Sequence, residues 1–256
     1  MSTSTEKSTL IERLFKSGSH FGFKKRRRHP TAAQYLFATK DGNDIFDLEK
    51  TAALLGEAKE VLKQAGLQGK TVLFVGTKTE ASKLLEAAAL RAEAPFAANR
   101  WIGGMLTNYS EIKKRINRLE TLNSEGESGE LERKYTKKER VVIGREMTKL
   151  NFNFFGISKM PKLPDYMLVV DPRHDQVAVK EALTLNIPLL AIMSSDCDAS
   201  QINHPVVAND SLQASVSMLL DELTDAYIEG KKAYVAPAPK PKAPATPVAS
   251  TQRRGS

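Results

Sequence analysis

Three short, almost wholly apolar runs, each followed by a helical pattern, constrain the fold of this chain more than any other feature. The runs lack the polar–apolar alternation of a strand with one face in water, so we expect both faces of each strand to be buried. Buried strands separated by helices indicate an α/β fold with a parallel sheet between helical layers. The predicted strands cover 71–75, 166–170, 189–193 and, as a shorter fourth, 206–207, and the helices cover 78–91, 174–185 and 211–228.

This alternation stops between Thr107 and Phe155, where no segment resembles a strand. Apolar residues are instead spaced three and four apart in two stretches, on either side of a charged connection over 123–135. The spacing predicts two antiparallel helices packed along a narrow seam, and about twenty helical residues would project about 30 Å. A helical subdomain packed on the sheet remains the alternative. The seam residues are Ile112, Ile116, Leu119, Ile143, Met147, Leu150 and Phe154.

The remaining segments complete the predicted organisation. Before the first apolar run we expect a helix over 7–17, two short strands at 35–38 and 44–48 around the turn 40–43, and a helix over 51–65. Beyond Gly230 a composition rich in Pro, Ala and Lys predicts disorder. The chain thus divides into an N-terminal helix and basic arm (1–30), the first part of the α/β domain (31–106), a helical hairpin insertion (107–160), the second part of the α/β domain (161–230) and a basic tail (231–256).

The segment HFGFKKRRRHP, residues 20–30, carries five consecutive cations. Adjacent like charges repel one another and pack poorly, so this basic arm is expected to meet a partner of opposite charge. A nucleic acid fits, because its phosphates pair with Lys and Arg while Phe21 and Phe23 can stack on bases. A solvated loop or a targeting signal remains the alternative. The five cations are Lys24, Lys25, Arg26, Arg27 and Arg28.

The net charge of +8 is concentrated in the appendages. Residues 1–30 carry eight Lys and Arg against two Glu, and residues 231–256 carry six against none, whereas 31–230 are acidic overall. This distribution suits a protein that grips a polyanion at its edges. Cys197 is the only cysteine, which excludes an intrachain disulfide and a thiolate cluster and fits a reducing compartment. Without a membrane-length apolar run or a secretory signal, we expect a cytoplasmic protein.

The segment RWIGGMLTN, residues 100–108, precedes the predicted hairpin and contains the only tryptophan. Its paired glycines permit a tight backbone path, and Thr107 is predicted to cap the first hairpin helix. Trp101 either fills the junction between sheet and hairpin or contacts RNA together with Arg100, and the sequence leaves both interpretations open. The first hairpin helix adds a basic side that consists of Lys113, Lys114, Arg115 and Arg118.

Patterns of catalysis or nucleotide binding are absent from the sequence. The GKT at 69–71 resembles the end of a phosphate-binding loop, but Gln64 stands where the motif needs glycine, and this GKT precedes a strand. The GTK at 76–78, after the first apolar strand, does not match the dinucleotide fingerprint. The four histidines lack metal-site spacing, and no catalytic triad is visible. Acidic residues do follow two predicted strands, where α/β enzymes often place them: Asp171, Asp175, Asp196 and Asp198.

Several ordered motifs together resemble those of the bacterial-type small-subunit ribosomal protein S2 family. The resemblance runs from about residue 8 to residue 230. The motifs are GSHFG (18–22), the basic arm with Arg27 and Pro30, IFDLEKT (45–51), VLFVGTK (72–78), RWIGGMLTN (100–108), LPD (163–165), VVDPR (169–173) and AVKEA (178–182). The chain departs from the family at Arg28, where tryptophan is usual. This change removes a ring that could stack on a base and adds a positive charge.

The resemblance implies a flavodoxin-like, three-layer α/β domain with a five-stranded parallel sheet and an inserted antiparallel, coiled-coil hairpin. It also implies a non-enzymatic structural constituent of the small ribosomal subunit. Such a protein binds small-subunit ribosomal RNA and neighbouring ribosomal proteins, including the largest, mRNA-capturing one, during assembly and translation.

The resemblance implies no catalytic residue, cofactor, metal site, small-molecule substrate or membrane partner, and Mg²⁺ would enter only as a structural ion held through RNA. A nucleotide-binding α/β enzyme and a protein-interaction adaptor acting off the ribosome remain the alternatives. The residues expected at the RNA are His20, Phe21, Lys24, Lys25, Arg26, Arg27, Arg28, Arg100, Trp101, Asn108, Lys113, Lys114, Arg115 and Arg118.

Overall fold

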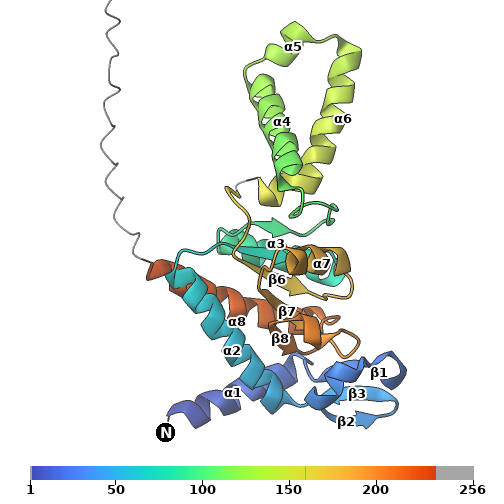
Figure 1. Cartoon of the computed structure of the whole chain (residues 1–256), viewed down its shortest axis with the longest axis vertical. Coiled ribbons are helices and arrows are strands. Elements are labelled where there is room, and N and C mark those ends of the chain that lie inside the picture. The colour runs from blue at the N-terminus through green and yellow to red at the C-terminus, as the bar shows by residue number, and fades with distance from the viewer. Residues whose placement is uncertain (1, 159, 235–256) are drawn as a thin grey trace, which may run out of the picture.

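A five-stranded parallel sheet forms the centre of the molecule in the computed structural model, which describes residues 2–158 and 160–234 (Figure 1). The strands lie in the order β5-β4-β6-β7-β8, which is the 2-1-3-4-5 order of flavodoxin-like folds. The predicted α/β class with a parallel sheet is confirmed. The strands are β4 (Val72–Val75), β5 (Phe96–Ala97), β6 (Tyr166–Val170), β7 (Leu189–Met193) and β8 (His204–Val207).

Helices cover both faces of this sheet, and alternate strand residues supply the two cores. Phe74 and Leu168 face the layer of α2 (Leu48–Leu67), α3 (Thr79–Arg91) and α8 (Gln213–Lys232). Leu73 and Met167 face α7 (Gln176–Thr184) and the base of the hairpin, and we call the core on this side of the sheet the second core. Because both faces are buried, β4, β6 and β7 consist almost entirely of apolar residues, which explains the continuous apolar runs in the sequence.

A second, antiparallel sheet is built from the N-terminal region, in the order β1-β3-β2. The predicted strand pair is present as β2 (Leu36–Lys40) and β3 (Asn43–Phe46), joined by Asp41 and Gly42 with left-handed φ values of 51° and 76°. The start of the basic arm was not predicted as a strand, yet it forms β1 (Phe21–Lys24). The other elements here are α1 (Ser2–Lys16) and the 3-10 turns η1 (Lys25–Arg27) and η2 (Pro30–Tyr35), and a further turn, η4 (Ala199–Gln201), precedes β8.

Two long helices between β5 and β6 project away from the α/β body (Figure 1). They are α4 (Tyr109–Glu127) and α6 (Lys137–Phe154). The short α5 (Glu130–Lys134) connects them, and the 3-10 turn η3 (Phe155–Ile157) follows α6 in the chain. The expected connection over 123–135 is mostly helical. The residues that pack α4 and α6 together and onto the second core are Ile112, Ile116, Leu119, Leu150 and Phe154. Only the base of this hairpin therefore packs on the sheet.

Candidate nucleic-acid interface

The basic arm is fixed to the body of the protein through its backbone. β1 pairs with β3, and the Lys25 N–H donates to the carbonyl of Gly42 at 2.9 Å. At the far end of the arm, the His29 N–H donates to the carbonyl of Ser195 at 2.8 Å. The first four cations of the arm nevertheless point into solvent, and none makes an ion pair with any residue that the structure describes: Lys24, Lys25, Arg26 and Arg27. The arm thus presents unpaired positive charge on an ordered backbone.

Arg28, the fifth cation of the arm, differs from the other four. Its Nε donates to Asp44 Oδ2 at 2.9 Å, and its Nη2 bonds both Asp44 Oδ1 and the Thr39 hydroxyl. The Asp44 side chain is fully buried, whereas that of Arg28 is 21 % exposed. Arg28 therefore joins the arm to β2 and β3, and most of its charge is neutralised inside the protein.

Arg28→Met is accordingly expected to destabilise the fold rather than only weaken binding. The substitution leaves the buried Asp44 carboxylate without its cation, and we expect a loss of about 2 kcal/mol in the free energy of unfolding, below the 3–5 kcal/mol of fully buried pairs. Arg26→Met removes an exposed cation and should stay within about 0.5 kcal/mol of the wild type. Denaturant unfolding of both variants tests this, and equal losses would contradict the assignment.

Three aromatic rings at the start of the arm lie against one another. The ring of His20 lies on that of Phe15 at a centroid distance of 4.6 Å and 10°, and against that of Phe21 at 4.0 Å. Burial lowers the pKa of His20, so its imidazole is neutral at neutral pH. Phe21 remains 52 % exposed and can offer a face to a base.

Phe23, by contrast, is engaged by its own protein. Its N–H donates to Ser195 Oγ at 3.1 Å, and its ring lies 5.6 Å from the Arg27 guanidinium carbon and 5.9 Å from Lys78 Nζ. Of the two phenylalanines that the sequence singled out, Phe21 is the one with an open ring face.

A single carboxylate organises the loop 100–108. Glu181 of α7 is 8 % exposed and accepts five hydrogen bonds of 2.8–3.1 Å. The donors are the indole Nε1–H of Trp101, the backbone N–H groups of Gly104, Leu106 and Thr107, and the Thr107 hydroxyl. The prediction that Thr107 caps α4 is wrong, because its hydroxyl is bound to Glu181 and the N-cap position belongs to Asn108. Gly104 has a φ of 87°, so the expected need for glycine holds at this position.

These hydrogen bonds keep Glu181 charged. Burial by itself would raise the pKa of Glu181, but the bonds from Thr107, Trp101 and the loop backbone outweigh burial and lower it. Trp101 packs against the second core and gives its only donor to Glu181, which favours its structural interpretation. Arg100 and Asn108 stay exposed on either side of the fixed loop.

The cations of α4 form a second basic surface. Lys114 pairs with Glu111 at 2.6 Å, and Arg118 lies 3.9 Å from Glu146 of α6. Lys113 and Arg115 are exposed and make no ion pair with any described residue. In Figure 1 this hairpin and the sheet that carries the arm lie at opposite ends of the long axis, so the predicted RNA-binding residues form two separate surfaces.

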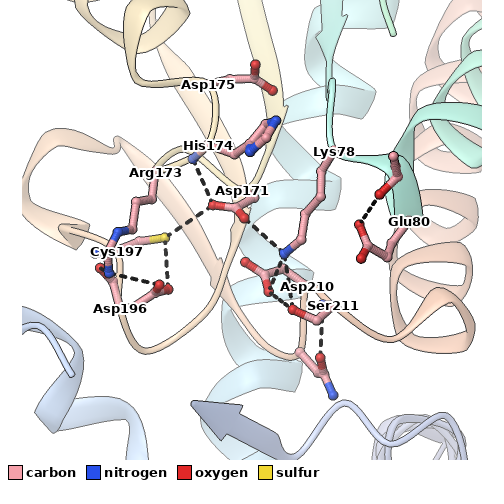
Figure 2. Close-up of polar contacts among 12 residues, drawn as sticks. Lys78, Glu80, Asp171, Arg173, His174, Asp175, Asp196, Cys197, Asp210 and Ser211 are labelled. Carbon is pink, nitrogen blue, oxygen red and sulfur yellow. Dashed lines mark hydrogen bonds and ion pairs between the residues drawn. The ribbon is translucent and has the colours of Figure 1, made fainter. Parts of the chain in front are cut away.

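A polar cluster at the carboxyl edge of the parallel sheet was not assembled by sequence reasoning (Figure 2). Lys78 follows β4, Asp171 follows β6 and Asp210 follows β8. The Lys78 ammonium lies 2.9 Å from Asp171 Oδ2, 3.3 Å from Asp210 Oδ1 and 3.1 Å from Ser211 Oγ. The sequence did contain one indication of this cluster: its residues follow predicted parallel strands, and the carboxyl ends of parallel strands meet at one edge of the sheet.

This cluster has the residue types of a cation site, and the protein supplies the cation. Oxygen and sulfur atoms of Asp171, Cys197 and Asp210 lie within 4.8 Å of one another. The Lys78 ammonium binds both carboxylates. Burial, reinforced by neighbouring carboxylates, raises the pKa of the Cys197 thiol, so the sulfur is protonated and a poor metal ligand. We therefore assign the cluster to the stability of the sheet edge.

Asp210 gives this cluster a pH dependence that can be measured. Burial and the charge of Asp171 raise the pKa of Asp210 to about 6, from 3.8 for a free carboxyl. The folded state then holds the extra proton between about pH 4 and 6, so this group's contribution to stability falls as pH rises through that window. Relative to Asp210→Asn, the wild type should lose up to about 3 kcal/mol between those pH values. If the free energies of unfolding of the two proteins differ by a constant amount from pH 4 to 7, this prediction is contradicted.

The turn at 76–78 does not offer a phosphate site. The Thr77 N–H donates to Asp175 Oδ2 at 2.9 Å and its hydroxyl to Asp175 Oδ1 at 2.7 Å. A nucleotide phosphate would need these donors, and a carboxylate of the protein already holds them. The geometry thus adds no support to the nucleotide-binding alternative.

Comparison with known proteins decides the family. The model of the family described as ribosomal protein S2 matches residues 14–230. The chain belongs to the ribosomal protein S2 family. Relatives named small ribosomal subunit protein uS2 include that of Petrotoga mobilis, 39 % identical over 225 residues (88 % of this chain and 78 % of the relative), and that of Dictyoglomus thermophilum, 40 % identical over 222 residues (87 % and 90 %). Protein uS2c of Mesostigma viride is 38 % identical over 226 residues (88 % and 99 %).

Membership of the S2 family makes this chain a structural ribosomal protein and not an enzyme, as the resemblance implied. The ribosome is also its place in the cell, in agreement with the expected cytoplasmic location. In the part of the chain that the structure describes, no helix has both the length and the apolar character needed to cross a bilayer.

Proposed function

We propose that this S2-family protein binds small-subunit ribosomal RNA with its basic arm and its helical hairpin. The observation that carries the proposal is the row of four exposed, unpaired cations, Lys24 to Arg27, on a backbone held by β3 and by the loop after β7. An ordered arm loses little conformational freedom when phosphates bind it. The surrounding protein leaves these charges uncompensated, so a polyanion is the natural partner.

The two surfaces suit contacts to separate RNA segments. The arm offers phosphate contacts and an open ring at Phe21, while Lys113 and Arg115 offer charge on the hairpin. Arg100 and Asn108 lie beside a loop that Glu181 fixes. Because the cations meet phosphates, RNA shape rather than base sequence should select the site.

The proposed partners follow from this role. The protein would take its place in the small ribosomal subunit, as the names of its relatives state for them, and would contact neighbouring ribosomal proteins, including the largest, mRNA-capturing one. We propose no cofactor, and Mg²⁺ would be held through the RNA. The acidic body between the basic appendages leaves surface for protein contacts.

Salt dependence of RNA binding tests this proposal. With six unpaired cations at the arm and hairpin in contact with phosphates, the logarithm of the association constant should fall against the logarithm of salt concentration with a slope of about −5. The measurement uses purified protein and small-subunit ribosomal RNA, with an equimolar unrelated acidic protein as a non-binding reference. A slope near zero, or saturation by a nucleoside triphosphate instead of RNA, would reject the proposal.

A further inference from the structure

Helix α6 has a second patterned face on the side away from the seam with α4. Residues three and four apart on this face form what we call the outer stripe, and a helix brings such residues onto one side. The stripe extends about 21 Å along the helix. In Figure 1 no other labelled element covers this side of α6. The outer stripe consists of Lys138, Val141, Val142, Arg145, Lys149 and Phe152.

The apolar members of the outer stripe are unusually exposed. Val141, Val142 and Phe152 expose 52 %, 58 % and 57 % of their surface. Val141 and Val142 are adjacent, and Phe152 follows ten residues later on the same side of α6, while the seam uses the other side of the helix. Exposed apolar side chains that share one face mark an interaction surface more often than scattered single residues do.

The charge on the outer stripe has one sign. Lys138, Arg145 and Lys149 are exposed, and none has an acidic partner among the described residues. The two acids of α6 are engaged elsewhere: Glu139 caps the helix by accepting from Thr136, and Glu146 faces Arg118 of α4. The face is therefore both apolar and positive.

A hollow beside the stripe provides a place for an anchoring side chain. It measures about 340 Å³ and is lined by Lys138 and Val142 of the stripe together with Tyr135, Arg118, Ile143 and the capping residue Glu139. Its wall combines aromatic and aliphatic surface with two cations, Arg118 and Lys138, and with the Glu139 carboxylate, which accepts hydrogen bonds from Thr136. Such a setting suits an apolar side chain followed by a carboxylate.

We propose that the outer stripe docks an acidic amphipathic helix of a neighbouring ribosomal protein. Its apolar residues would lie on Val141, Val142 and Phe152, and its carboxylates would meet Lys138, Arg145 and Lys149. RNA fits less well, because phosphates pair with the cations but leave the valines in water, and bases stack on planar rings. A second copy of the protein fits poorly, because its stripe would bring cations against cations. The C-terminal segment 235–256 of this chain also fits poorly, because it carries Lys and Arg without any acidic residue. The proposal rests on the proposed function, since it takes the partner from the small subunit.

Site-specific photo-cross-linking in assembled small subunits tests this docking surface. A photoreactive phenylalanine replaces Val142 or Phe152 in the full-length protein, and Gly144, which faces open space on another side of α6, carries the same group as control. We expect a cross-link to one protein segment with net negative charge and apolar residues three and four apart, at a yield more than about tenfold above the control. A cross-link to RNA, to a second copy or to a segment without that pattern, or no yield above the control, would overturn the proposal.

Charge reversal supplies the second arm of the experiment. Arg145→Glu with Lys149→Glu, in the protein that carries the photoreactive group at 142, should lower the cross-link yield more than about tenfold through like-charge repulsion. Lys83→Glu with Lys180→Glu makes the same charge change on α3 and α7 and should leave the yield unchanged. Equal yields in both double variants would contradict the charge complementarity.

The two proposals fail in different ways. If the unsubstituted protein sediments apart from small-subunit particles, the proposed function fails. If it sediments with them, yet positions 142 and 152 cross-link no better than position 144, only the docking surface fails. Incorporation is therefore measured on every variant before irradiation.

Discussion

Replacing Lys24, Lys25, Arg26 and Arg27 by glutamine is expected to lower the affinity for small-subunit ribosomal RNA by about 1000-fold at 0.1 M salt. Each lost phosphate contact removes about 0.7–0.9 released counterions, so four contacts change the slope of log K against log salt by about 3. At 0.1 M salt, one factor of ten below 1 M, a slope change of about 3 corresponds to a difference of about 1000-fold in affinity between variant and wild type. Because the four side chains are exposed and unpaired, the free energy of unfolding should change little. Filter binding over a salt series measures the slope.

Two smaller variants control for the change in net charge. Arg26→Gln with Arg27→Gln should produce about half of the change in slope. Lys83→Gln with Lys180→Gln removes the same charge from exposed positions on α3 and α7 and should leave the slope as it is. Similar slopes for these two double variants would show that general charge, rather than the arm, attracts the RNA.

Glu181→Gln is expected to destabilise the protein by about 4 kcal/mol and to release the loop 100–108. Five donors converge on the carboxylate. An amide places its own N–H₂ among them, so at least two donors lose their acceptor, and each costs about 1–3 kcal/mol when buried. Trp101 emission should shift to the red as its ring becomes wetter. Thermal unfolding followed by tryptophan fluorescence reports both effects.

The pH profile separates the charge of Glu181 from its shape. Its pKa in the folded protein is lowered, so the stability it contributes is fully present above its ordinary value of 4.5 and is lost as pH falls through the folded value. The difference in the free energy of unfolding between wild type and Glu181→Gln should therefore become smaller as the pH falls below 4.5. Glu57→Gln, at an exposed position on α2, serves as the control and should change neither stability nor emission. A constant gap down to pH 3 would argue against the carboxylate as the organiser of the loop.

The parts of the fold that were predictable are those whose signal is local. β4, β6 and β7 are buried on both faces, so each appears as an unbroken apolar run. β5 was missed by residue pattern because it has only two residues, and its place is set by pairing with β4. β1 was missed because FGFK runs into the cation cluster, and its strand depends on hydrogen bonds to the distant β3.

The candidate site divides in the same way. Exposure of Lys24 to Arg27 follows from charge repulsion alone, but the pairing of Arg28 with Asp44 depends on the second sheet. Glu181 was part of a quoted motif without an assigned role, because its donors lie more than seventy residues away in sequence. One signal was present: Glu181 stands among Ala178, Ala182 and Leu185, so a carboxylate interrupts the apolar face of a helix. A buried acid of this kind needs donors, and a loop with glycines and a tryptophan could supply them.

Sedimentation of the native protein in cell extract tests the central claim most directly, namely that cationic surfaces on a non-catalytic scaffold attach this chain to the RNA of the small subunit. Extract is resolved on a density gradient at low and at high salt. At low salt nearly all of the protein should migrate with small-subunit particles, and the variant without the four arm cations should remain mostly at the top. Wild-type protein that stays at the top, or an arm variant that enters the particles as fully as the wild type, would contradict the account.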